Sequence, residues 1–336
     1  MKKKDIMYKL YVISESFNDA TTFYIQIIED AIKAAGFNVE RINDTSYITQ
    51  EDIVITVGNK MFIDASKKKP MAQINWFQGV APEEVKYSHN SWFKKIIYYL
   101  GHTFYEWYAL KHASLSIMVS DTMKKHYSNK YGFDSAAFIM PCFNAFLNKS
   151  AFKDKFDKPT FVYAGNLAGW QCFEETVSLF SKIKESVPSA KLTVYTQDQE
   201  EAYAILKKYN VESDLRYVPY QQLSKEIQDY KYGFLVRADD PVNNVATPTK
   251  MNTYLANAII PIYSTVIGAF RDNLNGLHYA VPVDNIDDCV NKIVELENES
   301  IKPNDVLKDY SPIFEKYYSR EYYISALADL INQLSL

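Results

Sequence analysis

A stretch of polar and basic residues in the second half of the chain directly follows a short apolar run. Tyr232–Val236 is apolar along its length, as a parallel strand is when both of its faces are covered, and Arg237–Asp240 follows it. Pro248 suits the first turn of a helix, Thr247 is its expected N-cap, and Lys250 adds a positive charge to that turn. Unpaired N–H groups at a helix start favour an anion, so the pattern predicts a phosphate or diphosphate site. The alternative is a capped helix whose lysine is only solvated.

A second loop of the same kind begins after Phe161–Ala164. Gly165 would let a ligand approach the backbone closely, and a helix is predicted from Phe173. Neither a G-x-G-x-x-G nor a G-x-x-x-x-G-K-[ST] motif is present, so the loop carries no dinucleotide or P-loop fingerprint. The alternative is a tight turn at Gly165 with Trp170 as a packing residue. We expect this loop and Arg237–Lys250 to open on the same edge of one sheet.

Two carboxylates follow a predicted strand in the first half of the chain. Gln78 and Gly79 end the strand, and Glu83 and Glu84 come after Pro82. A carboxylate there could orient an acceptor hydroxyl or accept its proton. The alternative is that both acids occupy the first turn of a helix, where its dipole favours them. None of the five histidines has a neighbour at metal-ligand spacing, and each is expected to be packed or exposed.

Composition sets bounds on the class of protein. A length of 336 residues suggests two domains, and a net charge of −4 argues against nucleic-acid binding as the main task. Cys142, Cys172 and Cys289 form neither a zinc spacing nor a disulfide framework, which favours a reducing, cytoplasmic compartment. Met1–Asp5 resembles the start of a signal peptide, but no apolar core follows it. No run of about twenty apolar residues predicts a membrane span.

Strands and helices alternate in both halves, which predicts parallel βαβ units. In the first half, we expect strands at Lys9–Ser14, Phe37–Ile42, Asp52–Val57, Ala72–Phe77, Ser114–Ser120 and Ala136–Met140, with helices at Thr21–Ala35, Ser91–His112 and Asp121–Tyr131. After a linker at Phe143–Pro159, we expect strands at Thr160–Ala164, Lys191–Thr196, Leu215–Val218 and Tyr232–Val236, with helices at Phe173–Glu185, Glu200–Tyr209 and Gln221–Gln228. Tyr310–Leu334 is largely helical and long enough to reach back to the first domain.

The predicted helix Ser91–His112 is rich in aromatic residues and carries Lys94, Lys95 and Lys111. Such a helix could lie on a membrane surface with its rings at headgroup depth, as a lipid-linked acceptor would require. Because its cations are few, a mostly buried helix is the preferred interpretation, and peripheral membrane contact is the alternative.

These segments, in this order, resemble the GT-B glycosyltransferases, and within them glycosyltransferase family 4. The resemblance covers most of the chain and lies in Tyr163–Asn166, Lys191–Tyr195, Pro248–Lys250, Tyr254–Ala256 and Ile260–Pro261, and in the first half in Gln78–Glu84 and Val119–Lys124. It implies an α/β protein with two Rossmann-like domains facing across a cleft: an acceptor domain at 1–150, a donor domain at 151–318, and a C-terminal helix at 319–336 that packs back on the first domain.

The implied reaction moves a sugar from a nucleoside-diphosphate donor to an acceptor hydroxyl, without a metal or a further cofactor and with retention. The implied partners are the nucleotide sugar and a glycan or lipid-linked glycan acceptor. The implied setting is the assembly of a bacterial surface polysaccharide or glycoconjugate, in the cytoplasm or at the inner face of the plasma membrane.

The resemblance also assigns site residues. The catalytic set is Glu83, Arg237 and Lys250; the donor-binding set is Gly165, Asn166, Trp170, Asp239, Asn243, Asn244, Thr247, Thr249 and Thr253; the acceptor-binding set is Gln78, Gly79 and Glu84. The chain departs from the family at Thr253, where a glutamate usually bonds the ribose, and Val245 takes the place of the partner acid. Asp239 or Asp240 could supply a carboxylate instead. This departure leaves a catalytically silent binding subunit as an alternative, besides a sugar-nucleotide epimerase or a phosphorylase of the same fold.

Overall fold

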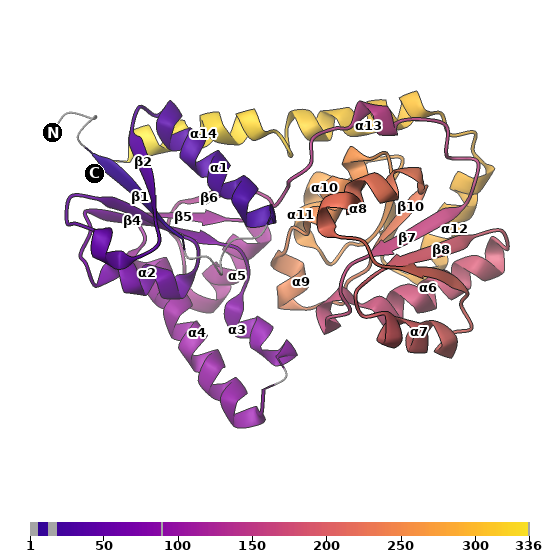
Figure 1. The fold of residues 1–336 in the computed structure, drawn as a ribbon, viewed down its shortest axis with the longest axis horizontal. Helices are drawn as coiled ribbons and strands as arrows, with labels where there is room; N and C mark the ends of the chain where they lie inside the picture. The colour runs from indigo at the N-terminus through magenta and orange to yellow at the C-terminus, as the bar shows by residue number, and fades with distance from the viewer. Residues whose placement is uncertain (1–5, 13–18, 89, 335–336) are drawn as a thin grey trace. The chain divides into compact units, whose positions relative to one another are not determined.

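The computed structural model describes residues 6–12, 19–88 and 90–334, which form two compact units (Figure 1). The first unit comprises the described residues up to Asn144, together with Asn244–Thr247 and the chain from Tyr318 onward. The second comprises Ala145–Asn243 and Pro248–Tyr317. Asn244–Thr247 thus groups with the first unit, although it lies within the range expected for the donor domain.

The first unit is built on a parallel six-stranded sheet with the order β2-β1-β3-β4-β5-β6. The strands are β1 (Met7–Tyr11), β2 (Asn38–Ile42), β3 (Ile53–Thr56), β4 (Ala72–Phe77), β5 (Leu115–Met118) and β6 (Ala137–Ile139). The helices are α1 (Asp19–Ala34), α2 (Asn59–Ser66), α3 (Ala81–Glu84), α4 (Trp92–His112), α5 (Asp121–Tyr131) and α14 (Arg320–Gln333), with short 3-10 turns η3 (Thr45–Tyr47) and η4 (Val85–Tyr87).

The second unit has a parallel six-stranded sheet with the order β12-β11-β10-β7-β8-β9. The strands are β7 (Thr160–Ala164), β8 (Lys191–Tyr195), β9 (Ser213–Arg216), β10 (Tyr232–Leu235), β11 (Ile260–Ser264) and β12 (Val281–Val283). The helical elements are α6 (Phe173–Ser186), α7 (Gln199–Lys208), α8 (Tyr220–Glu226), α10 (Thr249–Ala256), α11 (Gly268–Asn273), α12 (Ile286–Asn298) and α13 (Pro303–Glu315), with η5 (Lys149–Ala151), η6 (Gly169–Gln171) and η7 (Ile227–Asp229). The short helix α9 (Pro241–Val245) leads the chain out of this unit.

The strand orders locate the ligand-binding edges. In the first sheet the order reverses between β1 and β3, and in the second between β7 and β10. In open parallel sheets, ligands bind beyond the carboxyl ends of the strands at such a reversal. The strands β3, β4, β5 and β10 are buried at every residue, as expected for parallel strands covered on both faces. The prediction of two parallel α/β sheets in series is confirmed.

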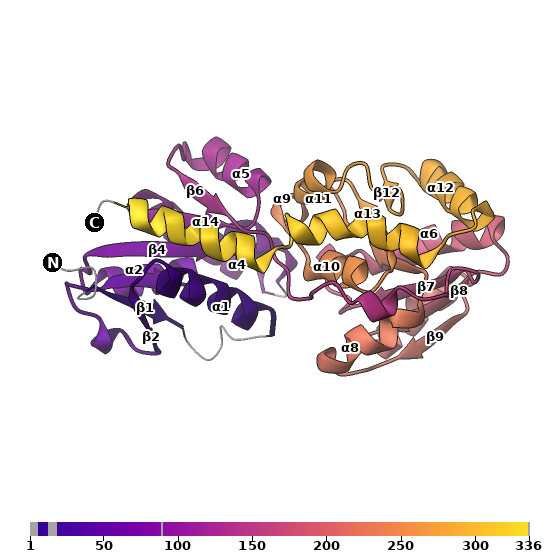
Figure 2. The ribbon, with the colours of Figure 1, turned by 90° about the horizontal axis from the view of Figure 1, so that it is seen from above.

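The helix α14 packs along α1 in the first unit, and Figure 2 shows the two side by side. Ser319 caps α14 by accepting a hydrogen bond from the Tyr322 N–H, and Arg320 forms an ion pair with Asp30 of α1. The rings of Tyr323 and Phe138 meet edge to face at 6.2 Å. The end of the chain therefore contributes to the core of the unit in which the chain begins.

Several local predictions were wrong. Thr247 does not cap α10: Pro248 is the residue before that helix, and the Thr247 hydroxyl instead accepts a hydrogen bond from the Cys142 N–H at 2.8 Å. The strand expected at Leu215–Val218 begins two residues earlier in the structure, at Ser213. The last two residues of the strand expected at Lys9–Ser14 lie outside the described residues.

The largest correction concerns α4. It forms where the sequence predicts it, but only Glu106, Ala109 and Leu110 of its residues are buried. The preferred interpretation of a mostly buried helix was wrong, because α4 contacts α2 and α3 but leaves most of its first turns uncovered. Along the described chain, no helix is both long and apolar enough to span a bilayer.

Candidate functional site

The first part of the candidate site is the loop after β7. Gly165 follows the strand, and its N–H donates to the Tyr195 carbonyl at 3.0 Å, which keeps the loop on the sheet edge. The Tyr163 hydroxyl donates to the Asn166 carbonyl at 2.8 Å and fixes the next residue. The turn η6 then leads to Cys172, which has a left-handed backbone with φ +51° and directly precedes α6. The loop therefore has a defined shape that places Gln171 beside the sheet edge.

Val236 and Arg237 follow the neighbouring strand β10, and Arg237 is only 6% exposed. Its backbone N–H donates to Ser264 Oγ at 2.9 Å, and its guanidinium donates to the Gln171 carbonyl at 3.1 Å and to Gln171 Oε1 at 2.6 Å. The next residue, Ala238, donates its N–H to Cys172 Sγ at 3.1 Å. These bonds tie the β10 loop to the β7 loop, as expected from the sequence.

Lys250 enters the same site from the first turn of α10. Its Nζ donates to Gln171 Oε1 at 2.8 Å and lies 5.0 Å from the centre of the Tyr163 ring. A Cβ built on Gly165 would be 2.5 Å from Nζ, so a larger residue there would force the lysine ammonium group to move. Arg237 and Lys250 thus share one uncharged acceptor, the Gln171 side chain.

The electrostatics of this pair favour an anion. Among the described residues, neither Arg237 nor Lys250 forms an ion pair with a carboxylate. Desolvation and then the Arg237 charge hold the pKa of Lys250 well below its usual range, and burial lowers the pKa of Arg237. Two desolvated cations without a countercharge destabilise the empty site, and a bound dianion would relieve that cost.

The other predicted donor-binding residues of the second unit are near Arg237 and Lys250 in sequence, but their side chains differ in exposure and contacts. Asp239 and Asn166 are exposed, whereas Thr249 and Trp170 are partly buried. The Asn243 side chain is 2% exposed and donates to the Ala238 carbonyl at 3.1 Å, so it stabilises its own loop.

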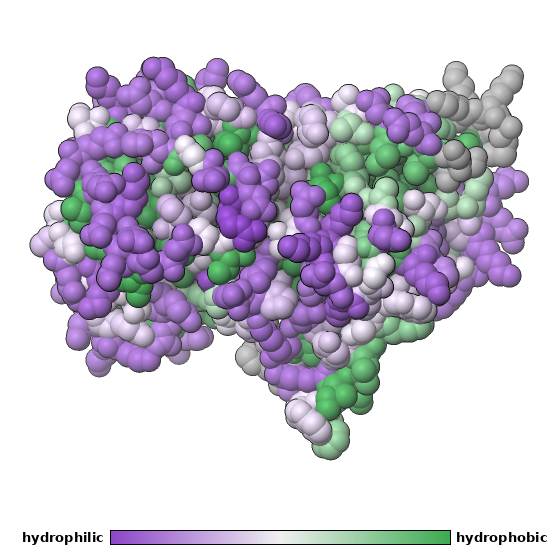
Figure 3. Space-filling view, turned by 180° about the vertical axis from the view of Figure 1, so that it is seen from behind, coloured by the Kyte–Doolittle hydropathy of each residue, from purple (hydrophilic) through white to green (hydrophobic). Residues whose placement is uncertain are grey.

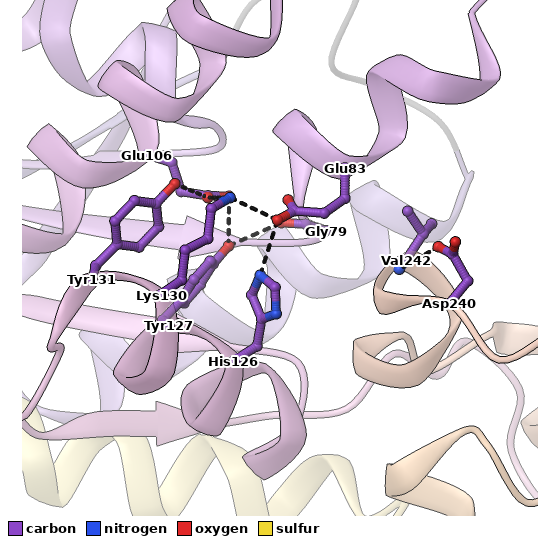
Figure 4. Close-up of polar contacts among 9 residues, drawn as sticks. All are labelled: Gly79, Glu83, Glu106, His126, Tyr127, Lys130, Tyr131, Asp240 and Val242. Carbon is purple, nitrogen blue, oxygen red and sulfur yellow. Dashed lines mark hydrogen bonds and ion pairs between the residues drawn. The ribbon is translucent and has the colours of Figure 1, made fainter.

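Asp240, the alternative carboxylate, and Thr253 of the expected donor set both form short-range hydrogen bonds. Asp240 accepts a hydrogen bond from the Val242 N–H at 2.9 Å at the start of α9 (Figure 4). The Thr253 hydroxyl donates to the Thr249 carbonyl one turn back in α10, at 3.1 Å. This bond uses the only hydrogen of the hydroxyl and leaves an uncharged acceptor at the expected ribose position.

Asn244 and Thr247 belong to the first unit. The segment that contains them is held there by the Ser120 hydroxyl, which donates to the Val245 carbonyl at 2.7 Å, and by the Cys142 N–H bond to Thr247.

A second candidate site lies in the first unit, at the carboxyl ends of β3 and β4. A cavity of about 690 Å³ is lined by residues that include Gly58, Gln78, Gly79, Glu84 and His102. The three predicted acceptor residues, Gln78, Gly79 and Glu84, thus share one cavity. A Cβ at Gly79 would collide with the Glu84 carboxylate, so a larger residue at this position would force that carboxylate to move. Glu84 as a whole residue is exposed, but it also forms part of the cavity wall. Desolvation by its surroundings raises the pKa of its carboxyl group, and the nearby Glu83 charge raises it further.

Glu83, the predicted catalytic carboxylate, points the other way, into a polar cluster between α3, α4 and α5 (Figure 4). Its Oε1 lies 2.7 Å from Lys130 Nζ and 3.3 Å from His126 Nε2. Burial acts to raise the pKa of Glu83, but the nearby His126 ring and the hydrogen bond and charge of Lys130 leave it lowered. Glu83 is not among the residues that line the cavity. Glu83 lies in the first turn of α3, as the alternative interpretation expected, and its contacts are those of a structural ion pair.

The same cluster contains a fully buried carboxylate. Glu106 is 0% exposed, lies 3.3 Å from Lys130 Nζ, and accepts hydrogen bonds from the Tyr131 and Tyr127 hydroxyls at 2.7 and 3.1 Å. Desolvation raises its pKa despite these partners. One lysine therefore serves two carboxylates.

Sequence reasoning missed Gln171, His102, His126 and Lys130. Gln171 lay inside the predicted loop but carries no charge, and no pattern distinguished its side chain from its neighbours. The contacts of His126 and Lys130 with Glu83 join positions more than forty residues apart, which no local motif reveals. Among the described residues, no group of three or more His, Cys, Asp and Glu side chains is arranged to hold a metal ion.

No family model matches the sequence, and no curated protein matches it. Solved structures do match the fold. A sucrose-phosphate synthase from Thermosynechococcus elongatus has a TM-score of 0.71 at 13% identity, over 98% of this chain and 99% of that one. An E. coli trehalose-6-phosphate structure with bound UDP-2-fluoro glucose has a TM-score of 0.62 at 8% identity, over 98% and 99%.

A S. aureus TarM mutant, in complex with fondaparinux, alpha-GlcNAc-glycerol and UDP, has a TM-score of 0.64 at 14% identity. The match covers 86% of this chain but only 56% of TarM, so the chain spans little more than half of that protein. At such identities the likeness establishes the fold: this chain has the two-sheet α/β architecture of GT-B glycosyltransferase structures. Its membership of family 4 stays a prediction.

Proposed function

We propose that the protein is a glycosyltransferase that moves a sugar from a nucleoside-diphosphate donor to an acceptor hydroxyl. One observation carries the proposal: Arg237 and Lys250 converge on Gln171 at the edge where the order of the second sheet reverses. This is the edge at which open parallel sheets bind nucleotides. The glycosyltransferase-type fold is consistent with the proposal, and the bound UDP of TarM and UDP-2-fluoro glucose of the E. coli structure make uridine nucleotides the first to test.

In this mechanism the donor diphosphate displaces the Gln171 oxygen as the partner of the two cations. Gly165 lets the phosphates approach the backbone of the β7 loop, since no side chain stands there. As the sugar leaves, negative charge grows on the diphosphate, and Arg237 and Lys250 stabilise it in a poorly solvated site. The two cations could provide the neutralisation that a divalent metal supplies elsewhere, which supports a metal-independent reaction.

The cavity of the first unit is the proposed acceptor site. Gln78, Glu84 and His102 offer hydrogen-bonding groups to the hydroxyls of a glycan or lipid-linked glycan. Glu84, with its raised pKa, is better placed than Glu83 to orient an acceptor hydroxyl. Retention of configuration, a role in bacterial surface polysaccharide or glycoconjugate assembly, and a cytoplasmic location complete the proposal and rest on the family resemblance.

Thr253 favours one second candidate, a catalytically silent binding subunit. Its hydroxyl is bonded within α10, so no charged group replaces the usual ribose-binding glutamate at that position. An uncharged acceptor gives up about 1–2 kcal/mol relative to a charged one. That loss would weaken donor binding without removing the diphosphate contacts.

A thermal-shift panel of UDP, GDP, dTDP and CMP with their common sugars, in the presence of EDTA, tests the proposal. One nucleotide family should raise the melting temperature of the parent protein and not that of Lys250→Ala; saturation at a hundredfold the dissociation constant adds about 2.7 kcal/mol. Release of the nucleotide from its sugar in the presence of glycan acceptors then separates an enzyme from a silent subunit. If no nucleotide shifts the parent protein, the donor site proposed here is wrong.

A further inference from the structure

The first turns of α4 form an apolar surface without a partner in the described chain. Trp92 is 67% exposed, Phe93 72%, Ile97 66% and Leu100 61%. Figure 3 shows hydrophobic residues gathered over this projecting end of the helix. Large apolar side chains that are exposed together in this way mark an interaction surface, whereas single exposed ones need no explanation. We define the α4 tip as residues 92–100.

The charges of the α4 tip have one sign. Lys94 is exposed, and Lys95 is partly exposed and donates to the Lys86 carbonyl at 2.8 Å. The only acid of α4 is Glu106, which is fully buried and paired with Lys130. The tip is therefore cationic and aromatic in a protein whose net charge is −4. Such a combination suits a surface that is apolar inside and anionic outside.

We propose that the α4 tip docks the protein on an anionic lipid bilayer. Trp92, Phe93, Ile97 and Leu100 would enter the region between headgroups and acyl chains, while Lys94 and Lys95 would remain among the anionic headgroups. The aromatic rings of Tyr98 and Tyr99, which are 45% and 42% exposed, belong at the same depth.

A second copy of the chain is a poorer occupant of the tip. A twofold interface brings the same patch of both copies together, so Lys94 and Lys95 would face their own equivalents. Because the tip offers no carboxylate to compensate them, that contact would be repulsive.

The position of α4 also indicates the class of acceptor, an inference that rests on the proposed function. His102, two residues after Leu100 along α4, lines the candidate acceptor cavity together with Gln78 and Glu84. A bilayer held at the tip would therefore be close to that cavity. This arrangement suits an acceptor glycan carried on a membrane lipid.

Flotation of the full chain with vesicles tests the docking. The protein should float with phosphatidylcholine vesicles that contain phosphatidylglycerol, more weakly with phosphatidylcholine alone, and less at high salt. Trp92→Ser with Phe93→Ser should weaken binding about 100-fold or more. Lys94→Gln with Lys95→Gln should weaken it about 25-fold at low salt, roughly fivefold for each lysine.

Matched controls come from the second unit. Tyr203→Ser with Ile286→Ser removes side chains that are 62% and 45% exposed, and Lys302→Gln with Lys316→Gln removes two exposed charges. Both pairs should bind vesicles as the parent does. Because all substituted residues of the tip lie on the surface, unchanged melting temperatures will show that the variants fold.

Three results would overturn the docking: no flotation with anionic vesicles, equal flotation of parent and tip variants, or a dimer in sedimentation that the Trp92 and Phe93 substitutions dissolve without vesicle binding. Nucleotide-induced thermal shifts, measured separately, keep the two proposals apart. A protein that binds vesicles and no nucleotide supports the docking and contradicts the glycosyltransferase.

Discussion

The ammonium group of Lys250 occupies the space that a side chain at Gly165 would need. A Cβ at Gly165 would lie 2.5 Å from Lys250 Nζ and 3.2 Å from its Cε. The residue that follows β7 thus has no side chain, and α10 can place a cation against the loop backbone, next to Gln171. The donor site depends on this close approach as much as on the charges themselves.

We expect Gly165→Ala to weaken nucleotide-sugar binding about tenfold to a hundredfold, because the added methyl group displaces one charge-assisted hydrogen-bond donor. Isothermal titration calorimetry with UDP-glucose measures the effect. Gly101→Ala is the control, since Gly101 lies in α4 and a Cβ there meets no atom within 4 Å. Equal losses in both variants would contradict the role given to Gly165.

Lys250→Met should strongly weaken donor binding and yet stabilise the empty protein by about 1–2 kcal/mol at neutral pH, because it removes a desolvated cation next to Arg237. The pKa of Lys250 is lowered in the folded state, so the unfolded chain binds more protons between the folded and unfolded pKa values. Stability conferred by the parent lysine therefore rises with pH, and the advantage of the variant should shrink toward alkaline pH. Urea unfolding at several pH values measures this, and a less stable variant at neutral pH would refute it.

Binding of a nucleotide sugar should take up a proton. The bound diphosphate favours the charged form of Lys250, so its pKa rises from the depressed value of the free protein toward its usual range. Affinity should consequently fall as pH rises through the window between these two values. Calorimetry with UDP-glucose in buffers of different ionisation enthalpy reports the proton directly, because a diphosphate diester does not itself titrate there. Lys250→Met, if it retains any binding, should show no uptake.

Gly233→Ala should disturb the donor site through Tyr254 of α10. A Cβ at Gly233 would lie 2.7 to 2.9 Å from three ring atoms of Tyr254, whose hydroxyl donates to the Phe234 carbonyl at 3.1 Å. Because Tyr254 fixes α10 on β10, the added methyl group should cost about 1–3 kcal/mol of stability and shift Lys250. Combining it with Tyr254→Leu, which frees the space, should restore part of that stability in thermal unfolding. Additive losses in the double variant would contradict the steric explanation.

Lys130→Met should destabilise the first unit by about 3–5 kcal/mol at neutral pH, because it leaves the buried Glu106 and Glu83 without their shared cation. The pKa of Glu106 is already raised in the folded protein, and loss of the lysine should raise it further. The folded variant then binds more protons than the unfolded chain, so its stability should fall as pH rises through that window. Lys67→Met, which breaks an exposed pair with Asp64, should cost 1 kcal/mol or less in the same urea series.

The sequence predicted the local order of the molecule well, since hydrophobic periodicity acts over a few residues. The helix Asp121–Tyr131 and the strands Ala72–Phe77 and Thr160–Ala164 have the predicted bounds. Gly165, Arg237 and Lys250 also come together as expected, because strands in a parallel sheet end at one edge and helices begin there.

Tertiary structure decided which partner each polar side chain has. Glu83 and Glu84 are adjacent and alike in sequence, yet one pairs with Lys130 and the other lines a cavity, because successive helical residues point in different directions. Gln171 bridges the two cations from a loop that ends in a left-handed residue, Cys172, and neither its partners nor this backbone conformation could be predicted from the sequence pattern.

The exposure of α4 shows most clearly that the partners of a segment are decided by the tertiary structure. Its apolar and aromatic composition is that of a core helix, and the sequence therefore predicted both the helix and its burial. Composition and periodicity determine whether a segment becomes helical and how much apolar surface it carries. What covers that surface depends on neighbours distant in the chain, and in the described structure α2 and α3 cover only part of α4.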